Sequence, residues 1–133
     1  MLPANRSMPD SMVVPVLAYR DPLEASAWLC QAFGFTERLR MANHRVQLAF
    51  GSGAVIATDR WQEAGAANHS VMVRVADVQA HHKQAVRAGA QILNPPTDYP
   101  YGECQYTAQD LGGHRWTFSQ TLADVDPASW LFP

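Results

Sequence analysis

The order of local sequence patterns occurs twice in this chain, and this internal repeat constrains the fold more than any other feature. In the first half, a strand-like apolar run at residues 13–19 precedes Asp21, a helical pattern and Gly34. In the second half, a strand-like run precedes Asp77, a helical pattern and Gly89. Aspartate before a helix and glycine after it are typical capping residues. The near-equal spacing predicts two copies of one module.

Short alternating segments separated by turn residues follow each helical pattern, and this period of two predicts three strands per module. The expected strands are residues 35–41, 44–50 and 54–58 in the first half, and 91–94, 103–108 and 115–120 in the second, where a Pro-rich loop joins the first two. The predicted fold class is therefore α+β, with two tandem βαβββ modules. We expect a flexible lead-in at 1–11, modules at 12–58 and 69–120, a linker at 59–68 and a tail at 121–133, all within one structural domain.

Composition excludes several classes of partner. The 133 residues carry a net charge of -2 with a pI near 6.2, which gives no basis for binding nucleic acid or an anionic membrane. Because the first residues lack the pattern of a secretion signal and no apolar run is long enough to cross a bilayer, we expect a cytoplasmic protein. Cys30 and Cys104 have no C-x-x-C spacing, so reduced, buried thiols are predicted.

Three segments together resemble the vicinal oxygen chelate superfamily, which includes glyoxalase I, bleomycin-resistance proteins and extradiol dioxygenases. They are V-P-V-L-A-Y-R-D, V-R-V-A-D-V and Y-T-A-Q-D-L-G-G-H-R-W. The resemblance covers about residues 12–120, although Leu111 and Gly112 differ from the residues that many relatives carry. It implies a curved, mostly antiparallel mixed sheet around a cavity that holds a divalent metal in the enzymes. It also implies a homodimer.

The resemblance further implies four metal-ligand positions, on the first and fourth strands of each module. Here they fall at Val14, Ser70, the strand ending before Asp59, and Thr117, none of which supplies a usual ligand for zinc, nickel, manganese or iron. We therefore expect no cofactor. A shift by one residue would turn every side chain to the other face. In that alternative, His69 and Glu103 would be ligands of a divalent metal (Zn, Ni, Mn or Fe).

The alternation along the strands predicts which side chains line the cavity. Trp116 and Phe118 are expected in the core, and the predicted ligand-binding residues are Arg45, Gln47, Trp61, Arg74, Tyr101, Gln105, Arg115 and Thr117. Glu103 is the carboxylate at a cavity-facing strand position, so it is a candidate base or ligand anchor. Alternatively, these polar residues are only the solvent-facing side of a half-buried sheet.

The remaining histidines are predicted to be structural. His81 and His82 are adjacent in a helix and point about 100° apart, so they do not converge on one ion and indicate a solvated helix face. His114 follows Gly113 and is expected to hydrogen-bond within its turn.

The predicted function is binding of a small molecule without a metal, by a homodimer, for resistance-type sequestration or for metabolite binding. The alternatives are a metal-dependent lyase, isomerase or dioxygenase, and an interaction domain without a ligand. Whether the protein is an enzyme stays open.

Overall fold

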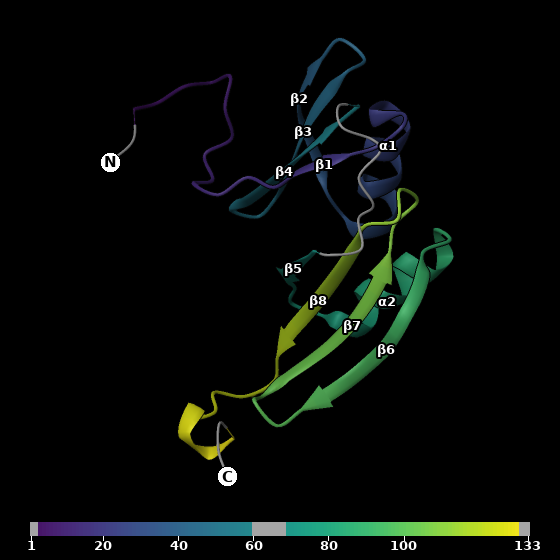
Figure 1. Cartoon of the computed structure of the whole chain (residues 1–133). Coiled ribbons are helices and arrows are strands. Elements are labelled where there is room, and N and C mark those ends of the chain that lie inside the picture. Colours follow the sequence, from purple (N-terminus) through teal and green to yellow (C-terminus); the bar gives the residue numbers. More distant parts are fainter. Residues whose placement is uncertain (1–2, 60–68, 131–133) are drawn as a thin grey trace. The chain divides into compact units, whose positions relative to one another are not determined.

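The computed structural model describes residues 3–59 and 69–130, and the chain forms two compact units, residues 1–65 and 66–133. The first unit contains β1 (Val16–Ala18), α1 (Pro22–Phe33), β2 (Thr36–Met41), β3 (Arg45–Phe50) and β4 (Gly53–Thr58). Its sheet has the order β1-β4-β3-β2 (Figure 1). β1 pairs with β4 in parallel, and the other pairs are antiparallel.

The second unit repeats this arrangement. It contains β5 (Ser70–Arg74), α2 (Val78–Arg87), β6 (Gln91–Tyr99), β7 (Glu103–Gln109) and β8 (Arg115–Thr121), followed by the short 3-10 helix η1 (Pro127–Ser129). The sheet order β5-β8-β7-β6, with β5 parallel to β8, matches the first sheet strand for strand. The predicted α+β class and the tandem βαβββ modules are thus confirmed.

Both helices begin where the sequence predicts, because an aspartate caps each one. Asp21 Oδ1 accepts the backbone N–H groups of Leu23 and Glu24 at 3.1 and 3.2 Å. Asp77 Oδ1 accepts the N–H of Ala80 at 3.0 Å. These bonds satisfy amides that have no partner within the first helical turn. After α1, Gly34 takes the left-handed φ of 85° that ends a helix at low steric cost.

Each unit buries its own core between a helix and one face of its sheet. In the second unit, α2 covers one face of the sheet, as Figure 1 shows. The buried side chains include Leu17, Leu29, Phe33, Val46 and Leu48 in the first unit, and Val78, Ala85, Tyr106, Trp116 and Phe118 in the second. Among the described residues, no helix has the length and apolar character needed to cross a membrane.

Two predicted boundaries are wrong. The opening strand is only Val16–Ala18, shorter than the apolar run at residues 13–19. The Pro-rich loop does not exist as such, because β6 continues through Pro95 and Pro96 to Tyr99. A proline lacks the N–H that a central strand needs, but β6 lies at the edge of its sheet, where β7 is its one partner among the described strands. The register shifts between Asn94 and Thr97, so both prolines lie in an irregular part of the ladder.

Candidate functional site

The last strand, β8, has two faces of opposite character. Trp116 and Phe118 are fully buried, and Phe118 lies against α2 with its ring centroid 4.1 Å from that of His81. Arg115 is exposed and Thr117 is half-buried on the opposite side. We call this side the open face of the second sheet. By the strand register, it consists of Ser70, Met72, Arg74, Glu103, Gln105, Thr107, Gln109, Arg115, Thr117, Ser119 and Thr121.

A chain of hydrogen bonds runs across the open face. The Tyr101 hydroxyl donates to Gln105 Oε1 at 3.2 Å, and Gln105 Nε2 donates to Ser119 Oγ at 3.0 Å. Ser119 Oγ donates to Glu103 Oε1 at 2.6 Å. We call these bonded side chains, from Tyr101 to Glu103, the strip. Because each group fixes the next one, the strip is a preorganised polar surface rather than a set of independently solvated side chains.

Glu103 is held in its ionised form. The hydrogen bond from Ser119, and then that from Thr121, lower the pKa of Glu103 below its ordinary value of 4.5, and the positive charge of Arg74 adds to the effect. Arg74 Nη2 also donates to Thr121 Oγ1 at 3.0 Å. A general base works best with a pKa near the working pH, so this environment favours the role of an anionic anchor over that of a base.

Aromatic side chains stand at one end of the open face. The rings of Tyr99 and Tyr101 are 5.4 Å apart and nearly parallel, and Trp130 of the tail lies 5.1 Å from Tyr101. Burial raises the pKa of Tyr101, with smaller contributions from Tyr99 and Glu103, so its hydroxyl keeps its proton and donates. The predicted aromatic residue Trp61 lies outside the described residues.

The turn between β7 and β8 is built around the buried carboxylate of Asp110. Its Oδ1 accepts the N–H groups of Gly112 and His114, both at 2.9 Å. Its Oδ2 accepts the Trp116 indole N–H at 2.9 Å. The His114 backbone thus bonds within the turn as predicted. The imidazole of His114 is buried beside the ring of His69, with centroids 5.5 Å apart.

The prediction that His81 and His82 form a solvated helix face is wrong. Both are half-buried, because α2 turns them toward the sheet. His81 Nδ1 and the Tyr106 hydroxyl share a hydrogen bond of 2.6 Å, and the edge of His82 meets the ring of Tyr106 at 5.1 Å. Burial raises the pKa of Tyr106, so the phenol stays neutral. These histidines join α2 to the core and do not reach the open face.

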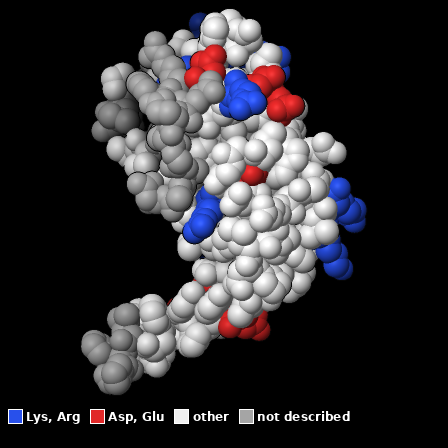
Figure 2. Space-filling view, turned by 45° about the vertical axis from the view of Figure 1, so that its right-hand side comes forward, with Lys and Arg blue, Asp and Glu red and all other residues white. Residues whose placement is uncertain are grey.

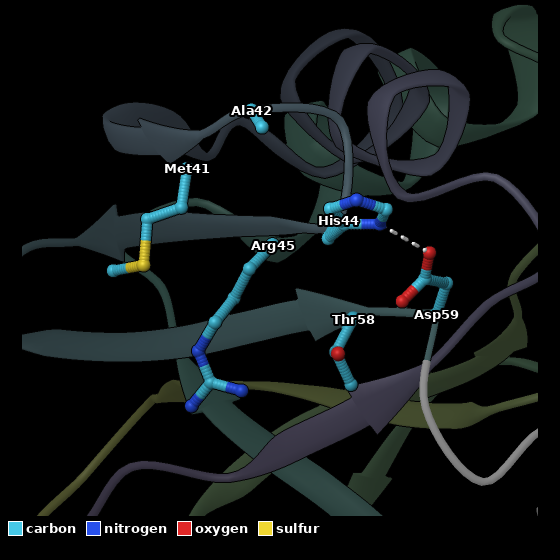
Figure 3. A pocket seen from close by; sticks show the side chains of 6 residues that line it. All are labelled: Met41, Ala42, His44, Arg45, Thr58 and Asp59. Carbon is cyan, nitrogen blue, oxygen red and sulfur yellow. Dashed lines mark hydrogen bonds and ion pairs between the residues drawn. The ribbon is translucent and has the colours of Figure 1, made fainter.

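The first unit has a hollow of about 730 Å³ at the edge of the sheet where β2 and β4 end and β3 begins. Met41, Ala42, His44, Arg45, Thr58 and Asp59 line it (Figure 3). Arg45 pairs with Thr58 across the ladder and points to the same side. His44 Nδ1 lies 3.0 Å from Asp59 Oδ2. The predicted residue Arg45 therefore lies in a hollow, but in a different unit from Arg74, Gln105, Arg115 and Thr117.

Gln47, the other predicted residue of the first unit, is 1% exposed and already engaged. Its Oε1 accepts a short hydrogen bond from Arg38 Nη1, and its Nε2 donates to the Ser7 carbonyl at 2.8 Å. The lead-in thus contacts the first sheet through this side chain.

The two alternative metal ligands do not converge. His69 precedes Ser70, which pairs with Arg115 at the start of β8, whereas Glu103 pairs with Thr121 at its end. Six residues of strand correspond to about 20 Å at about 3.3 Å per residue. One ion cannot bind both side chains in this arrangement. In residues 3–59 and 69–130, no group of three or more His, Cys, Asp or Glu side chains is placed to hold a metal.

The cysteines are both free, as predicted, although Cys30 is only half-buried. Burial raises the pKa of each thiol, which disfavours the reactive thiolate. Charged groups are scattered over the surface that Figure 2 shows, and its described residues form no continuous basic area.

Three residues of the open face are missing from the predicted site: Ser119, Thr107 and Thr121. Thr107 and Thr117 share a hydrogen bond of 3.0 Å between their hydroxyls. Alternation along the strands already places all three on the same side as Arg115. What the sequence lacks is the register of β7 against β8, which decides that Ser119 lies opposite Gln105.

The sequence profile described as "Glyoxalase/Bleomycin resistance protein/Dioxygenase superfamily" matches residues 11–118. The chain is similar to the crystal structure of TioX from Micromonospora sp. ML1, with 34% identity, a TM-score of 0.69, and coverage of 87% of this chain and 100% of that one. A family enzyme from Burkholderia phytofirmans PsJN matches with 18% identity, a TM-score of 0.72, and 82% and 97% coverage.

The fosfomycin resistance protein FosX from Listeria monocytogenes matches with 11% identity, a TM-score of 0.69, and 85% and 94% coverage. At 18% and 11% identity, the latter two matches show a shared fold only. No curated protein sequence matches the chain. From the profile over residues 11–118 and the relative at 34% identity, the chain belongs to the glyoxalase/bleomycin resistance protein/dioxygenase superfamily.

Proposed function

We propose that this protein binds a small molecule on the open face of the second sheet without a metal, either to sequester a toxic compound or to hold a metabolite. The observation that carries the proposal is the hydrogen-bonded strip from Tyr101 through Gln105 and Ser119 to Glu103. A few fixed polar groups beside aromatic rings are typical of a small-molecule site.

The rest of the open face supports a ligand rather than a buried contact within the unit. Met72 is 60% exposed in the middle of β5, and Arg74 and Arg115 are exposed on either side. An exposed methionine provides apolar contact area, and an arginine fork binds carboxylate or phosphate oxygens. The ligand class that fits is a compound with an aromatic or apolar part and at least one anionic or strongly polar group.

Two features support a mechanism without metal. At the positions where the resemblance implies ligands, Ser70 opens β5 and the Thr117 hydroxyl bonds to that of Thr107. His69 and Glu103 lie at opposite ends of β8. Binding would therefore rest on hydrogen bonds, charge and apolar contact.

A thermal-shift screen of small aromatic acids and amides tests the proposal, because a ligand of the native state raises its melting temperature. We expect at least one compound to stabilise the protein. The shift should be lost in Arg115→Ala and Gln105→Leu, and kept in Arg45→Ala, which changes the first unit.

Elemental analysis of protein purified without chelator is the second measurement. Stoichiometric zinc, nickel, manganese or iron would overturn metal independence, and a shift that all three variants keep would overturn the site.

A further inference from the structure

The N-terminal segment is attached to the first sheet by side chains that bind its backbone. We call residues 5–11 the N-terminal strap. Gln47 Nε2 donates to the Ser7 carbonyl at 2.8 Å, and Arg38 Nη2 donates to the Arg6 carbonyl at 2.9 Å. Arg38 and Gln47 also bond to each other. Two donors that are fixed on the sheet therefore hold two consecutive peptide carbonyls.

These two hydrogen bonds are made to the backbone of the strap and not to its side chains. A carbonyl oxygen is present at every residue, so the Arg38–Gln47 pair fits any peptide that can place two neighbouring carbonyls above it. Gln47 is 1% exposed, and a buried amide that loses its acceptor costs free energy. The position therefore favours an occupied state, either by the strap or by another peptide.

Apart from the buried side chain of Pro9, the strap itself has few anchors. Residues 3–8 are exposed and belong to no helix or strand. Within the strap, Ser7 N–H donates to Asn5 Oδ1 and Met8 N–H donates to the Asn5 carbonyl, so it forms a local turn. Besides the two carbonyl contacts, Ser11 Oγ donates to the Ser52 carbonyl at 2.7 Å. Segments with few buried contacts open at a small free-energy cost.

The internal repeat shows that this arrangement is particular to the first unit. Val16 and Met72 both lie five residues before a capping aspartate, and they pair with Ile56 and Thr117. Gln47 is the β3 partner of Ile56, and its counterpart in the second unit is Thr107, the β7 partner of Thr117. The Thr107 hydroxyl bonds across the sheet to Thr117 instead of reaching a peptide carbonyl.

We propose that the Arg38–Gln47 pair is a recognition site for the backbone of a short peptide, and that the strap is its internal occupant. The ligand class is a peptide with two consecutive carbonyls turned toward the sheet. A peptide ligand must displace the strap, so the strap lowers the apparent affinity of the Arg38–Gln47 pair for that ligand. This site lies on the first sheet and does not depend on the ligand proposed for the open face of the second.

The test uses the full chain with a protease recognition sequence inserted between Met12 and Val13, which are both 82% exposed. The protein is folded intact, cut, and separated from the released segment, and circular dichroism checks that it stays folded. The probe is a fluorescent synthetic peptide of residues 3–11, followed by anisotropy. Because a tethered strap acts at an effective concentration in the millimolar range, we expect the probe to bind the uncut chain about tenfold more weakly than the cut chain.

Matched variants assign the effect to the two donors. Gln47→Leu should weaken binding of the probe to the cut chain about tenfold, whereas Thr107→Val, at the corresponding place in the second unit, should leave it unchanged. A probe with Arg6→Ala and Ser7→Ala should bind within about twofold, because the contacts are to backbone oxygens. Should Gln47→Leu fail to fold, the cut Arg38→Ala chain replaces it, because Arg38 is exposed, and it should weaken binding of the probe in the same direction. Equal binding to cut and uncut chains, or no binding to a folded cut chain, would overturn the proposal.

Discussion

At the scale of single residues, the side chains of the open face depend on one another. Ser119 is 1% exposed, yet it both accepts from Gln105 and donates to Glu103, so it joins an amide to a carboxylate. The sequence predicts that these residues share a face, since side chains in a strand alternate with a period of two. It does not predict their bonds, because the pairing of Gln105 with Ser119 depends on the register between β7 and β8, which the geometry of the turn around Asp110 sets.

Glu103 gives a prediction about pH. Its pKa is lower in the folded protein than its ordinary value of 4.5, so the folded state favours the ionised form. The stabilisation is therefore present above pH 4.5 and is lost as the pH falls through the folded pKa. Compared with the parent chain, Glu103→Gln should lower the melting temperature near neutral pH and lose this difference in acid. Melting curves between pH 3 and 7 measure it, and a difference that does not change with pH would contradict this cause.

At the scale of elements, local signals predict the helices well and the strands only in part. The bounds of α1 are confirmed because Asp21 and Gly34 act within one turn of the helix. The local sequence does not predict that β6 extends through Pro95 and Pro96. Whether a strand tolerates proline depends on its place in the sheet, which is set by pairing with β7 and not by the nearby sequence.

The turn between β7 and β8 gives the second prediction. Asp110 accepts hydrogen bonds from two backbone amides and from the Trp116 indole, in a buried position. Asp110→Ala should lower the free energy of unfolding by about 2–4 kcal/mol, because buried donors lose their acceptor. Urea denaturation measures the change. The control is Asp126→Ala, which removes one exposed bond to the Ala128 amide at η1 and should cost below about 1 kcal/mol. Similar losses in both variants would contradict the central role of Asp110.

At the scale of the whole molecule, the two units keep one topology while their corresponding positions have diverged. Ala18 and Ala54 of the first sheet correspond to Arg74 and Arg115 of the second, by the same register that relates Val16 to Met72. The repeat is visible in the sequence because caps and strand periods are local. The division into an occupied first face and an open second face is not, since it depends on where residues 5–11 are held.

Assembly is the prediction at this scale. The side chain of Val16, on the edge strand β1 of the first sheet, is 45% exposed, and its burial would favour association of two chains. We expect multi-angle light scattering at micromolar concentration to give the mass of a dimer. Val16→Asp should shift it to a monomer, while Val86→Asp, at an exposed position of α2, should not. A monomeric parent chain would contradict the prediction.

The prolines of β6 also bear on how the protein behaves at high concentration. An outer strand with a regular row of free N–H and C=O groups can add a strand from another molecule, which is a common start of aggregation. In β6, Pro95 and Pro96 remove two consecutive donors, and the ladder is irregular on both sides of Asn94. The outer flank of the second sheet is therefore a poor template for a further strand. This protects the chain against edge-to-edge polymerisation at the same strand that ends in the aromatic cluster of the open face.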